Sequence, residues 1–169
     1  MVQVKPESGN DRVLPHVVVG LVSDTHGLVR PECLRALAGS DLILHAGDVG
    51  GAHVLEALRQ LAPVHAVCGN TDVFGAGLPA RVAFEVGGLA IHVSHGNEVG
   101  SPTPVRLVQR YGADIIVFGH THRPVVERIG RQLVVNPGAA GPARFHLVPS
   151  IARLVIEAGE ARAELVALV

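Results

Sequence analysis

Residues 17–26 read Val17-Val18-Val19-Gly20-Leu21-Val22-Ser23-Asp24-Thr25-His26. The first six form a continuous apolar run, which is typical of a β-strand with both faces buried. The run ends just before a carboxylate and an imidazole, the side chains of Asp24 and His26. In open α/β sheets, ligands bind at the carboxyl ends of the strands. This stretch therefore predicts a buried strand that brings two metal-type ligands to one edge of a sheet.

Four further short apolar runs end at the same kinds of side chain. In chain order, the runs and the residues that follow them are 42–44 with Asp48, 64–68 with Asn70, 89–93 with His95, and 115–118 with His120 and His122. A lone Asp or His at a strand end is more often structural than functional. Packing alone does not explain why seven such residues follow five apolar runs. We therefore expect their side chains to meet at one edge of the fold.

The order of helices and strands predicts a mixed α/β (α+β) domain. Apolar residues at helical spacing indicate a helix from Pro31 to a stop at Gly39, a second over 51–61, and a third from Pro104 after a Thr103 cap. Strand–helix–strand alternation of this kind gives right-handed βαβ units and parallel strands.

The second half of the chain changes to an antiparallel pattern. The Gly-Gly pair at 87–88 and the Gly-Arg pair at 130–131 each separate two strand-like runs, which is a hairpin signal. Residues 145–168 read as two long strands around 158–160. We therefore expect a two-sheet αββα sandwich of mixed sheets, with βαβ units N-terminally, antiparallel strands C-terminally and helices outside.

Length and composition favour one folded domain. The chain has 169 residues, of which 48% are hydrophobic and 17% charged, enough apolar material for one core. Residues 1–15 contain a polar stretch at 5–11, lack the apolar segment of a secretory signal, and are expected to form a flexible leader. Residues 16–169 are expected to form the single domain.

Charge and cysteine usage narrow the expected partners and compartment. The net charge is -1 with no Lys/Arg cluster, which argues against nucleic acid and anionic membrane surfaces as partners. No apolar run approaches the roughly 18 residues needed to cross a membrane. Cys33, in a predicted helix, and Cys68, predicted on a strand, are expected to be reduced core residues, which points to the cytoplasm.

The candidate ligands define the chemistry of the expected site. Imidazole, carboxylate and one amide suit Mn²⁺, Fe, Zn²⁺ or Ni²⁺ better than Ca²⁺ or Mg²⁺. Seven ligands are too many for one tetrahedral ion, but they suit two ions about 3.5–4 Å apart. Asp48 is the expected bridge, because its strand should lie between the others. Such a pair yields a bridging hydroxide near neutral pH and clamps a phosphoryl oxygen, which favours phosphate-ester hydrolysis.

Five motifs in this order resemble the calcineurin-like metallophosphoesterase superfamily. They are Asp24-Thr25-His26, Gly47-Asp48, Gly69-Asn70, Ser94-His95-Gly96 and Gly119-His120-Thr121-His122. The chain is most similar to the small single-domain phosphodiesterase branch, whose N-P-G motif and following Arg are matched by Asn136-Pro137-Gly138 and Arg144. The similarity covers roughly residues 16–156.

The resemblance implies roles for the seven residues and for the whole protein. One metal would be held by Asp24, His26 and His122, the other by Asn70, His95 and His120, with Asp48 bridging them. The catalytic set would be Asp48, Asn70 and His95 around the bridging hydroxide. The resemblance also implies the αββα sandwich, activation by Mn²⁺, a small phosphate-ester substrate, and a homodimer or homotetramer.

One position departs from the family pattern. Many members follow the Gly-Asn pair with a His that protonates the leaving group, whereas this chain has Thr71 and then Asp72. Loss of a general acid typically costs about 10²–10⁴-fold in rate, and the cost is smallest for a phenolate leaving group. We therefore expect a preference for good leaving groups, as in aryl phosphodiesters. Asp72, if exposed, would be ionised near pH 7. The small branch commonly lacks the acid His, so an enzyme is still expected.

Other functions remain as alternatives. A non-catalytic interaction scaffold is one, since the retromer subunit that shares this fold has an incomplete metal pocket and binds partners. A nuclease or a phosphomonoesterase is another. The nuclease would need DNA-capping segments that the chain lacks, and the phosphomonoesterase suffers most from the missing acid.

The sequence leaves several residues with two readings. His45 could orient a ligand or be structural, and Arg144 could steer a phosphate or be an exposed structural residue. The turn at 136–138 could shape the pocket or only end a strand, and residues 71–80 could form a lid or only a connection. The sequence identifies neither the physiological substrate nor the native metal.

Overall fold

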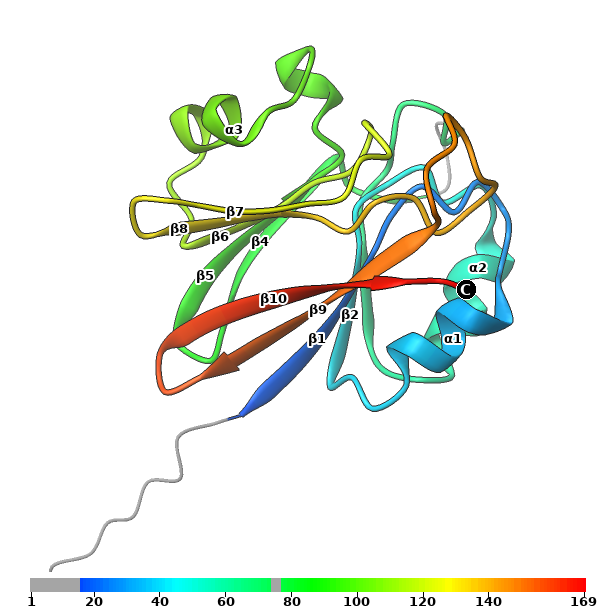
Figure 1. Cartoon of the computed structure of the whole chain (residues 1–169), viewed down its shortest axis with the longest axis horizontal. Coiled ribbons are helices and arrows are strands. Elements are labelled where there is room, and N and C mark those ends of the chain that lie inside the picture. Colours follow the sequence, from blue (N-terminus) through cyan, green and yellow to red (C-terminus); the bar gives the residue numbers. More distant parts are fainter. Residues whose placement is uncertain (1–15, 74–76) are drawn as a thin grey trace, which may run out of the picture.

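Two five-stranded mixed sheets stack face to face between two layers of helices (Figure 1). The computed structural model describes residues 16–73 and 77–169, so the expected leader at 1–15 lies outside the described residues. The expected αββα sandwich, with βαβ units early and antiparallel strands late, is confirmed.

The first sheet has the strand order β10-β9-β1-β2-β3. Its strands are β1 (Val17–Val22), β2 (Leu42–His45), β3 (Val64–Ala66), β9 (Ser150–Glu157) and β10 (Glu160–Ala167). β1, β2 and β3 are parallel, and β9 and β10 complete the sheet in antiparallel register. β2 therefore lies between its two parallel neighbours, as the sequence predicts for the strand that leads to Asp48.

The second sheet has the strand order β4-β5-β6-β8-β7. Its strands are β4 (Arg81–Val86), β5 (Leu89–Ser94), β6 (Ile115–Val117), β7 (Val125–Ile129) and β8 (Gln132–Asn136). β5, β6 and β8 are parallel, while β4 and β7 form the antiparallel edges. The predicted hairpins around 87–88 and 130–131 join β4 to β5 and β7 to β8, and the one around 158–160 joins β9 to β10.

Burial of both strand faces explains the continuous apolar runs. In β1, Leu21 points into the core between the sheets, whereas Val22 points outward to a helix-covered core. In β6, Ile115 lies between the sheets and Ile116 packs under a helix. Because neighbouring side chains alternate between two buried faces, each must be apolar.

The helices cover the outer faces of the sheets (Figure 1). They are α1 (Pro31–Leu37), α2 (Ala52–Arg59) and α3 (Pro104–Arg110), with a 3₁₀ turn over Asn97–Val99. α1 and α2 pack on the first sheet and α3 on the second. The predicted Thr103 cap is confirmed, since its side chain accepts a hydrogen bond from Arg106 N at 3.3 Å. Among the described residues, no helix is long and apolar enough to cross a membrane.

The prediction for Cys68 was wrong in part. β3 ends at Ala66, so Cys68 lies in a loop rather than on a strand, and it is half-buried. Val67 N still donates to His45 O at 3.0 Å, but Cys68 N donates to Pro79 O at 2.9 Å, so the chain at Cys68 pairs with the segment before β4 and no longer with β2. Cys33 is buried as expected, and both cysteines are free thiols.

Candidate metal centre

All seven predicted ligands lie in loops that follow the carboxyl ends of five parallel strands. Asp24 and His26 follow β1, Asp48 follows β2, and Asn70 follows β3. The imidazoles of the second sheet come after β5 and β6, whose ends face the same edge of the sandwich. The structure therefore brings together residues that span about a hundred positions of the sequence.

Asp24, His26 and His122 form one cluster. Each offers a nitrogen or oxygen atom, and these atoms all lie within 4.8 Å of one another. His122 Nε2 is 3.1 Å from Asp24 Oδ1, and 3.4 Å from His26 Nε2. These are the three residues that the resemblance assigns to one metal.

Asn70, His95 and His120 form a second cluster around one oxygen atom. Asn70 Oδ1 is 3.0 Å from His95 Nε2 and 2.9 Å from His120 Nδ1. His95 Nδ1 lies 2.7 Å from Ala46 O, so this nitrogen donates to the carbonyl. In the neutral ring, Nε2 then carries a lone pair that faces the Asn70 oxygen. A cation between the two atoms would satisfy both.

Asp48 lies between the two clusters. Its Oδ2 is 3.8 Å from His26 Nε2 and 3.4 Å from His95 Nε2. Its Oδ1 accepts a hydrogen bond from Thr71 N at 2.9 Å, which fixes the carboxylate plane. Asp24, Asp48 and His95 also offer ligand atoms within 4.8 Å of one another, so Asp24 too lies near both clusters.

The donor set fits divalent cations. Asp24 is fully buried, and its Oδ1 has no hydrogen-bond partner among the described residues. Its Oδ2, by contrast, accepts from Ser23 Oγ at 2.6 Å and from His120 N at 3.2 Å. A buried carboxylate oxygen without a partner is costly, and this one lies 3.1 Å from His122 Nε2 and 3.9 Å from His26 Nε2, where a cation would satisfy it.

The local electrostatics match this reading. Burial raises the pKa of Asp48, but the neighbouring His95 imidazole and the Thr71 N–H more than offset this and hold it well below its usual range. Burial lowers the pKa of His95, but the Asp48 carboxylate 3.4 Å away and the Asp24 charge raise it overall. Burial lowers the pKa of His26. Carboxylates that stay ionised beside imidazoles are the state in which such groups bind cations.

Five of the seven residues have a left-handed backbone. The φ angles are 53° at Asp24, 46° at His26, 52° at Asp48, 67° at His120 and 58° at His122. Non-glycine residues rarely adopt this region, and such strain concentrates at functional sites. Here each such position carries one of the seven ligand-type side chains.

Glycines leave room for the carboxylates in two of the ligand loops. A β-carbon at Gly119 would overlap Ser23 Oγ and lie 2.8 Å from Asp24 Oδ2, and one at Gly69 would overlap Asp48 Oδ1. From sequence alone these glycines could be ordinary strand-end punctuation. The close approach shows that they are required by the packing of the carboxylates.

His45 ties two ligand loops together. It is fully buried, and burial lowers its pKa to about 4, so it is neutral. Gly47 N donates to His45 Nδ1 at 3.2 Å, which leaves Nε2–H to donate to Thr25 Oγ1 at 2.9 Å. Thr25 Oγ1 then donates to Val49 O at 2.8 Å. His45 therefore supports the loops that carry Asp24 and Asp48 without pointing at the clusters itself.

Asn136 has a comparable role for the second sheet. It is fully buried, and its Nδ2 donates to Gly119 O at 2.9 Å and to Thr121 Oγ1 at 3.0 Å. It thereby holds the turn that carries His120 and His122. The turn at 136–138 thus shapes the site through this loop.

Asp72 is not the exposed carboxylate that the sequence suggests. It is half-buried, and its side chain accepts hydrogen bonds from Val49 N at 3.1 Å, Gly50 N at 3.0 Å and Gly69 N at 2.8 Å. The carboxylate therefore joins the loop after Asp48 to the loop before Asn70. No sequence signal distinguishes this role from that of an exposed loop residue.

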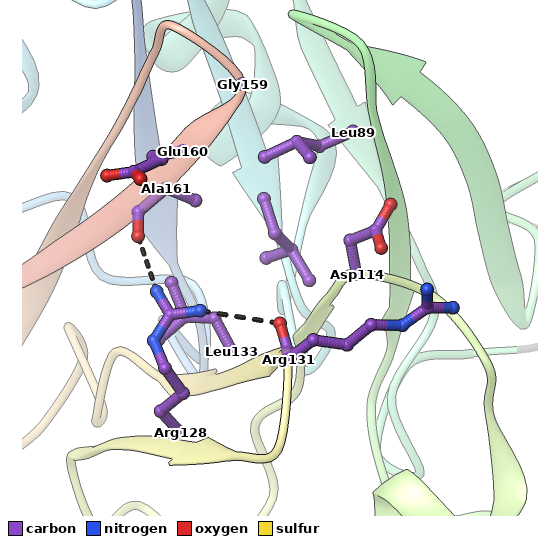
Figure 2. Close-up of a pocket in the computed structure, with 9 residues that line it drawn as sticks. Leu89, Asp114, Arg128, Arg131, Leu133, Gly159, Glu160 and Ala161 are labelled. Carbon is purple, nitrogen blue, oxygen red and sulfur yellow. Dashed lines mark hydrogen bonds between the residues drawn. The ribbon is translucent and has the colours of Figure 1, made fainter.

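A cavity of about 460 Å³ lies elsewhere, at the opposite ends of the strands (Figure 2). Asp114, which directly precedes β6, lines it together with the β9–β10 hairpin. Arg128 Nη2 donates to Ala161 O at 2.7 Å there, so one of its two arginines is engaged by backbone. Because the metal-type clusters lie at the other strand ends, this cavity is not part of the candidate metal centre.

Comparison with known proteins identifies the family. A family model described as the calcineurin-like phosphoesterase superfamily domain matches residues 17–159. A probable metallophosphoesterase of Methanocaldococcus jannaschii is 35% identical over 150 residues, which are 83% of this chain and 77% of that protein. A phosphodiesterase of the same organism is 25% identical over 140 residues, 71% of this chain and 82% of its own length.

A solved structure supports the same assignment of the fold. Vps29 of Entamoeba histolytica, in a complex with Zn²⁺, superimposes with a TM-score of 0.71 at 26% identity. The match covers 90% of this chain and 99% of that one. The fold is therefore similar to that of a protein crystallised with Zn²⁺.

The Asp72 contacts predict an effect on metal binding. In Asp72→Asn, an amide NH₂ would face backbone N–H groups, and we expect the free energy of unfolding to fall by about 1–3 kcal/mol. Because the loops of Asp48 and Asn70 are then less fixed, Mn²⁺ affinity by calorimetry should fall about tenfold or more.

Asp41→Asn is the matched control, since Asp41 also accepts a backbone hydrogen bond, from Val18 N at 2.8 Å. It lies away from the clusters and should keep the Mn²⁺ affinity of the wild type. An Asp72→Asn protein that is less stable but binds Mn²⁺ normally would show that Asp72 has no positioning role.

Proposed function

Because this chain belongs to the calcineurin-like phosphoesterase superfamily, we propose that it is a metal-dependent phosphodiesterase acting on a small phosphate ester. The observation that carries the proposal is the convergence of imidazole and carboxylate atoms within 4.8 Å around buried Asp24 and Asp48. The relative named a phosphodiesterase supports the reaction type.

The proposed cofactor is a pair of divalent ions, with Mn²⁺ preferred and Fe, Zn²⁺ or Ni²⁺ as alternatives. Asp24, His26 and His122 would hold one ion, the cluster around Asn70 Oδ1 the other, and Asp48 would serve both. Two such ions lower the pKa of a shared water and neutralise charge on phosphoryl oxygens. The positions of the ligand loops would be fixed by the hydrogen bonds of His45, Asp72 and Asn136.

The residues near the clusters favour substrates with good leaving groups. Thr71 is exposed, its amide donates to Asp48 Oδ1 at 2.9 Å, and its hydroxyl is too weak an acid to protonate a basic leaving group. His45 is buried and fully hydrogen-bonded, and the Asp72 carboxylate is occupied by three backbone N–H groups. None of the three is placed to protonate a basic alkoxide, whereas an aryl phosphodiester needs little acid catalysis.

We further propose a small-molecule substrate rather than nucleic acid, a cytoplasmic location, and a homodimer or homotetramer. The net charge of -1 without a basic cluster supports the first point. Two free cysteines are compatible with the second. The oligomer rests on family resemblance alone.

A non-catalytic scaffold of the same fold is the second candidate. The similarity to Vps29 favours it, at a TM-score of 0.71. The full set of seven ligand-type side chains favours the enzyme, because a scaffold has no need to hold them together at strained backbone angles.

Metal content and turnover separate the two candidates. We expect the purified protein to bind about two Mn²⁺ per chain and to hydrolyse bis-p-nitrophenyl phosphate only when loaded. Asp48→Asn should weaken both ions and reduce turnover at least about hundredfold, whereas Asp41→Asn should do neither. Full metal occupancy without hydrolysis of any phosphodiester would favour the scaffold, and an unaltered Asp48→Asn enzyme would remove the shared role of Asp48.

Thr71 predicts how the rate depends on the leaving group. In the wild type, the rate should fall steeply across a series of phosphodiesters as the pKa of the leaving group rises. Thr71→His should flatten this dependence and raise the rate for alkoxide leaving groups by about 10²-fold or more, because an imidazole can donate the proton.

Thr71→Val removes only the hydroxyl and serves as the control, with the slope expected to match the wild type. If Thr71→Val alone made the slope steeper, the threonine hydroxyl would be an acid after all, and the proposed leaving-group preference would need another cause.

A further inference from the structure

The loop between β8 and β9 presents a large aromatic side chain next to the metal centre. Phe145 is 76% exposed, although removing a phenylalanine side chain from water is favourable. Its ring lies 6.3 Å from the ring of His122 in an edge-to-face arrangement, at an interplanar angle of 64°. The exposed ring therefore stands directly beside one of the seven ligand-type side chains.

The backbone of this loop is strained at the same place. Phe145 has φ 56° and His146 has φ 59°. A left-handed conformation is a genuine outlier for a bulky residue and persists only where the surroundings impose it. The strained backbone and the exposed ring therefore occur at the same residue, Phe145.

The base of the loop is fastened to the first ligand loop. Ala140 N donates to Ser23 O at 2.9 Å and Gly141 N donates to Asp24 O at 3.1 Å. Arg30 donates to Gly141 O through Nε at 3.2 Å and through Nη2 at 3.1 Å. The position of the loop relative to Asp24 is thus fixed by backbone hydrogen bonds.

A cation accompanies the exposed ring. Arg144 is exposed and lines a small recess together with His122. Within the described part of the chain, no carboxylate lies within ion-pair distance of its guanidinium. A free guanidinium and an exposed aromatic ring beside a phosphoryl-binding site form a surface that suits an aromatic phosphate ester.

We propose that Phe145 forms a subsite for a planar aromatic group attached to the phosphoryl group of the substrate. The aromatic group packs against the Phe145 ring, and Arg144 pairs with a phosphoryl oxygen. This inference rests on the proposed phosphodiesterase function and narrows its substrate class to aryl or nucleobase-containing esters. The group that packs on Phe145 is expected to be part of the substrate, because the Phe145 ring lies beside His122, one of the ligand-type side chains.

Binding of two phosphonates tests the subsite without relying on turnover. Phenylphosphonate and methylphosphonate offer the same anionic head, and only the first carries an aromatic ring. For the Mn²⁺-loaded wild type, calorimetry should show phenylphosphonate binding about three- to tenfold tighter. Phe145→Ala should lose this preference, Phe145→Tyr should keep it, and Phe145→Leu should keep only the part due to apolar contact.

Control variants and metal binding identify the other possible roles. Val105→Ala removes an exposed apolar side chain from α3 and should leave the preference unchanged. Mn²⁺ affinity should be unchanged in Phe145→Ala, since Phe145 holds no ion. An unchanged preference in Phe145→Ala overturns the proposal, whether or not metal affinity or oligomeric state changes. In those cases Phe145 shields His122 or forms a contact between copies of the chain.

Failure of the wild type has a separate meaning. If neither phosphonate binds the Mn²⁺-loaded protein, the phosphoryl site itself is absent, and the proposed function fails together with the subsite. If both bind equally well, the phosphoryl site stands and only the aromatic subsite is overturned. Hydrolysis of nucleotide and nitrophenyl phosphodiesters by wild type and Phe145→Ala then shows which aromatic group is preferred.

Discussion

Two buried carboxylates, those of Asp24 and Asp48, set the central constraint of this structure. They are almost completely excluded from solvent and offer oxygen atoms close to one another among imidazoles. Like charges in such surroundings are unfavourable unless cations or hydrogen bonds compensate them. Asp24 Oδ1 lacks a hydrogen-bond partner among the described residues. The strained turns, the tight glycines and the supporting network of His45 and Asp72 are explained if they hold these charges in place for metal ions.

Much of the fold could be predicted because it follows from side-chain alternation. β1 and β6 are buried on both faces, so their sequences are continuously apolar, and the ligands after them mark the strand ends. The hairpin at 87–88 uses two glycines with positive φ, which sequence alone indicates. Such features depend on local geometry and on the period of burial, and both are visible in a single chain.

The supporting residues could not be predicted, because their roles depend on loops from different strands meeting in space. Asp72 looks like an exposed loop residue, yet it binds backbone amides from two loops. Cys68 continues an apolar run, yet the chain has already left the sheet. The contact of Phe145 with His122 joins loops after β8 and β6. These features depend on contacts between segments far apart in the sequence, and no local sequence pattern indicates them.

The central claim is that seven side chains hold a pair of cations that share Asp48. Crystals of the protein grown with Mn²⁺, measured at the manganese absorption edge, test it most directly. The account predicts two anomalous peaks about 3.5–4 Å apart, one beside Asp24, His26 and His122, the other beside Asn70, with an Asp48 oxygen between them. A single peak, no peak, or an Asp48 carboxylate turned away from both ions would contradict it.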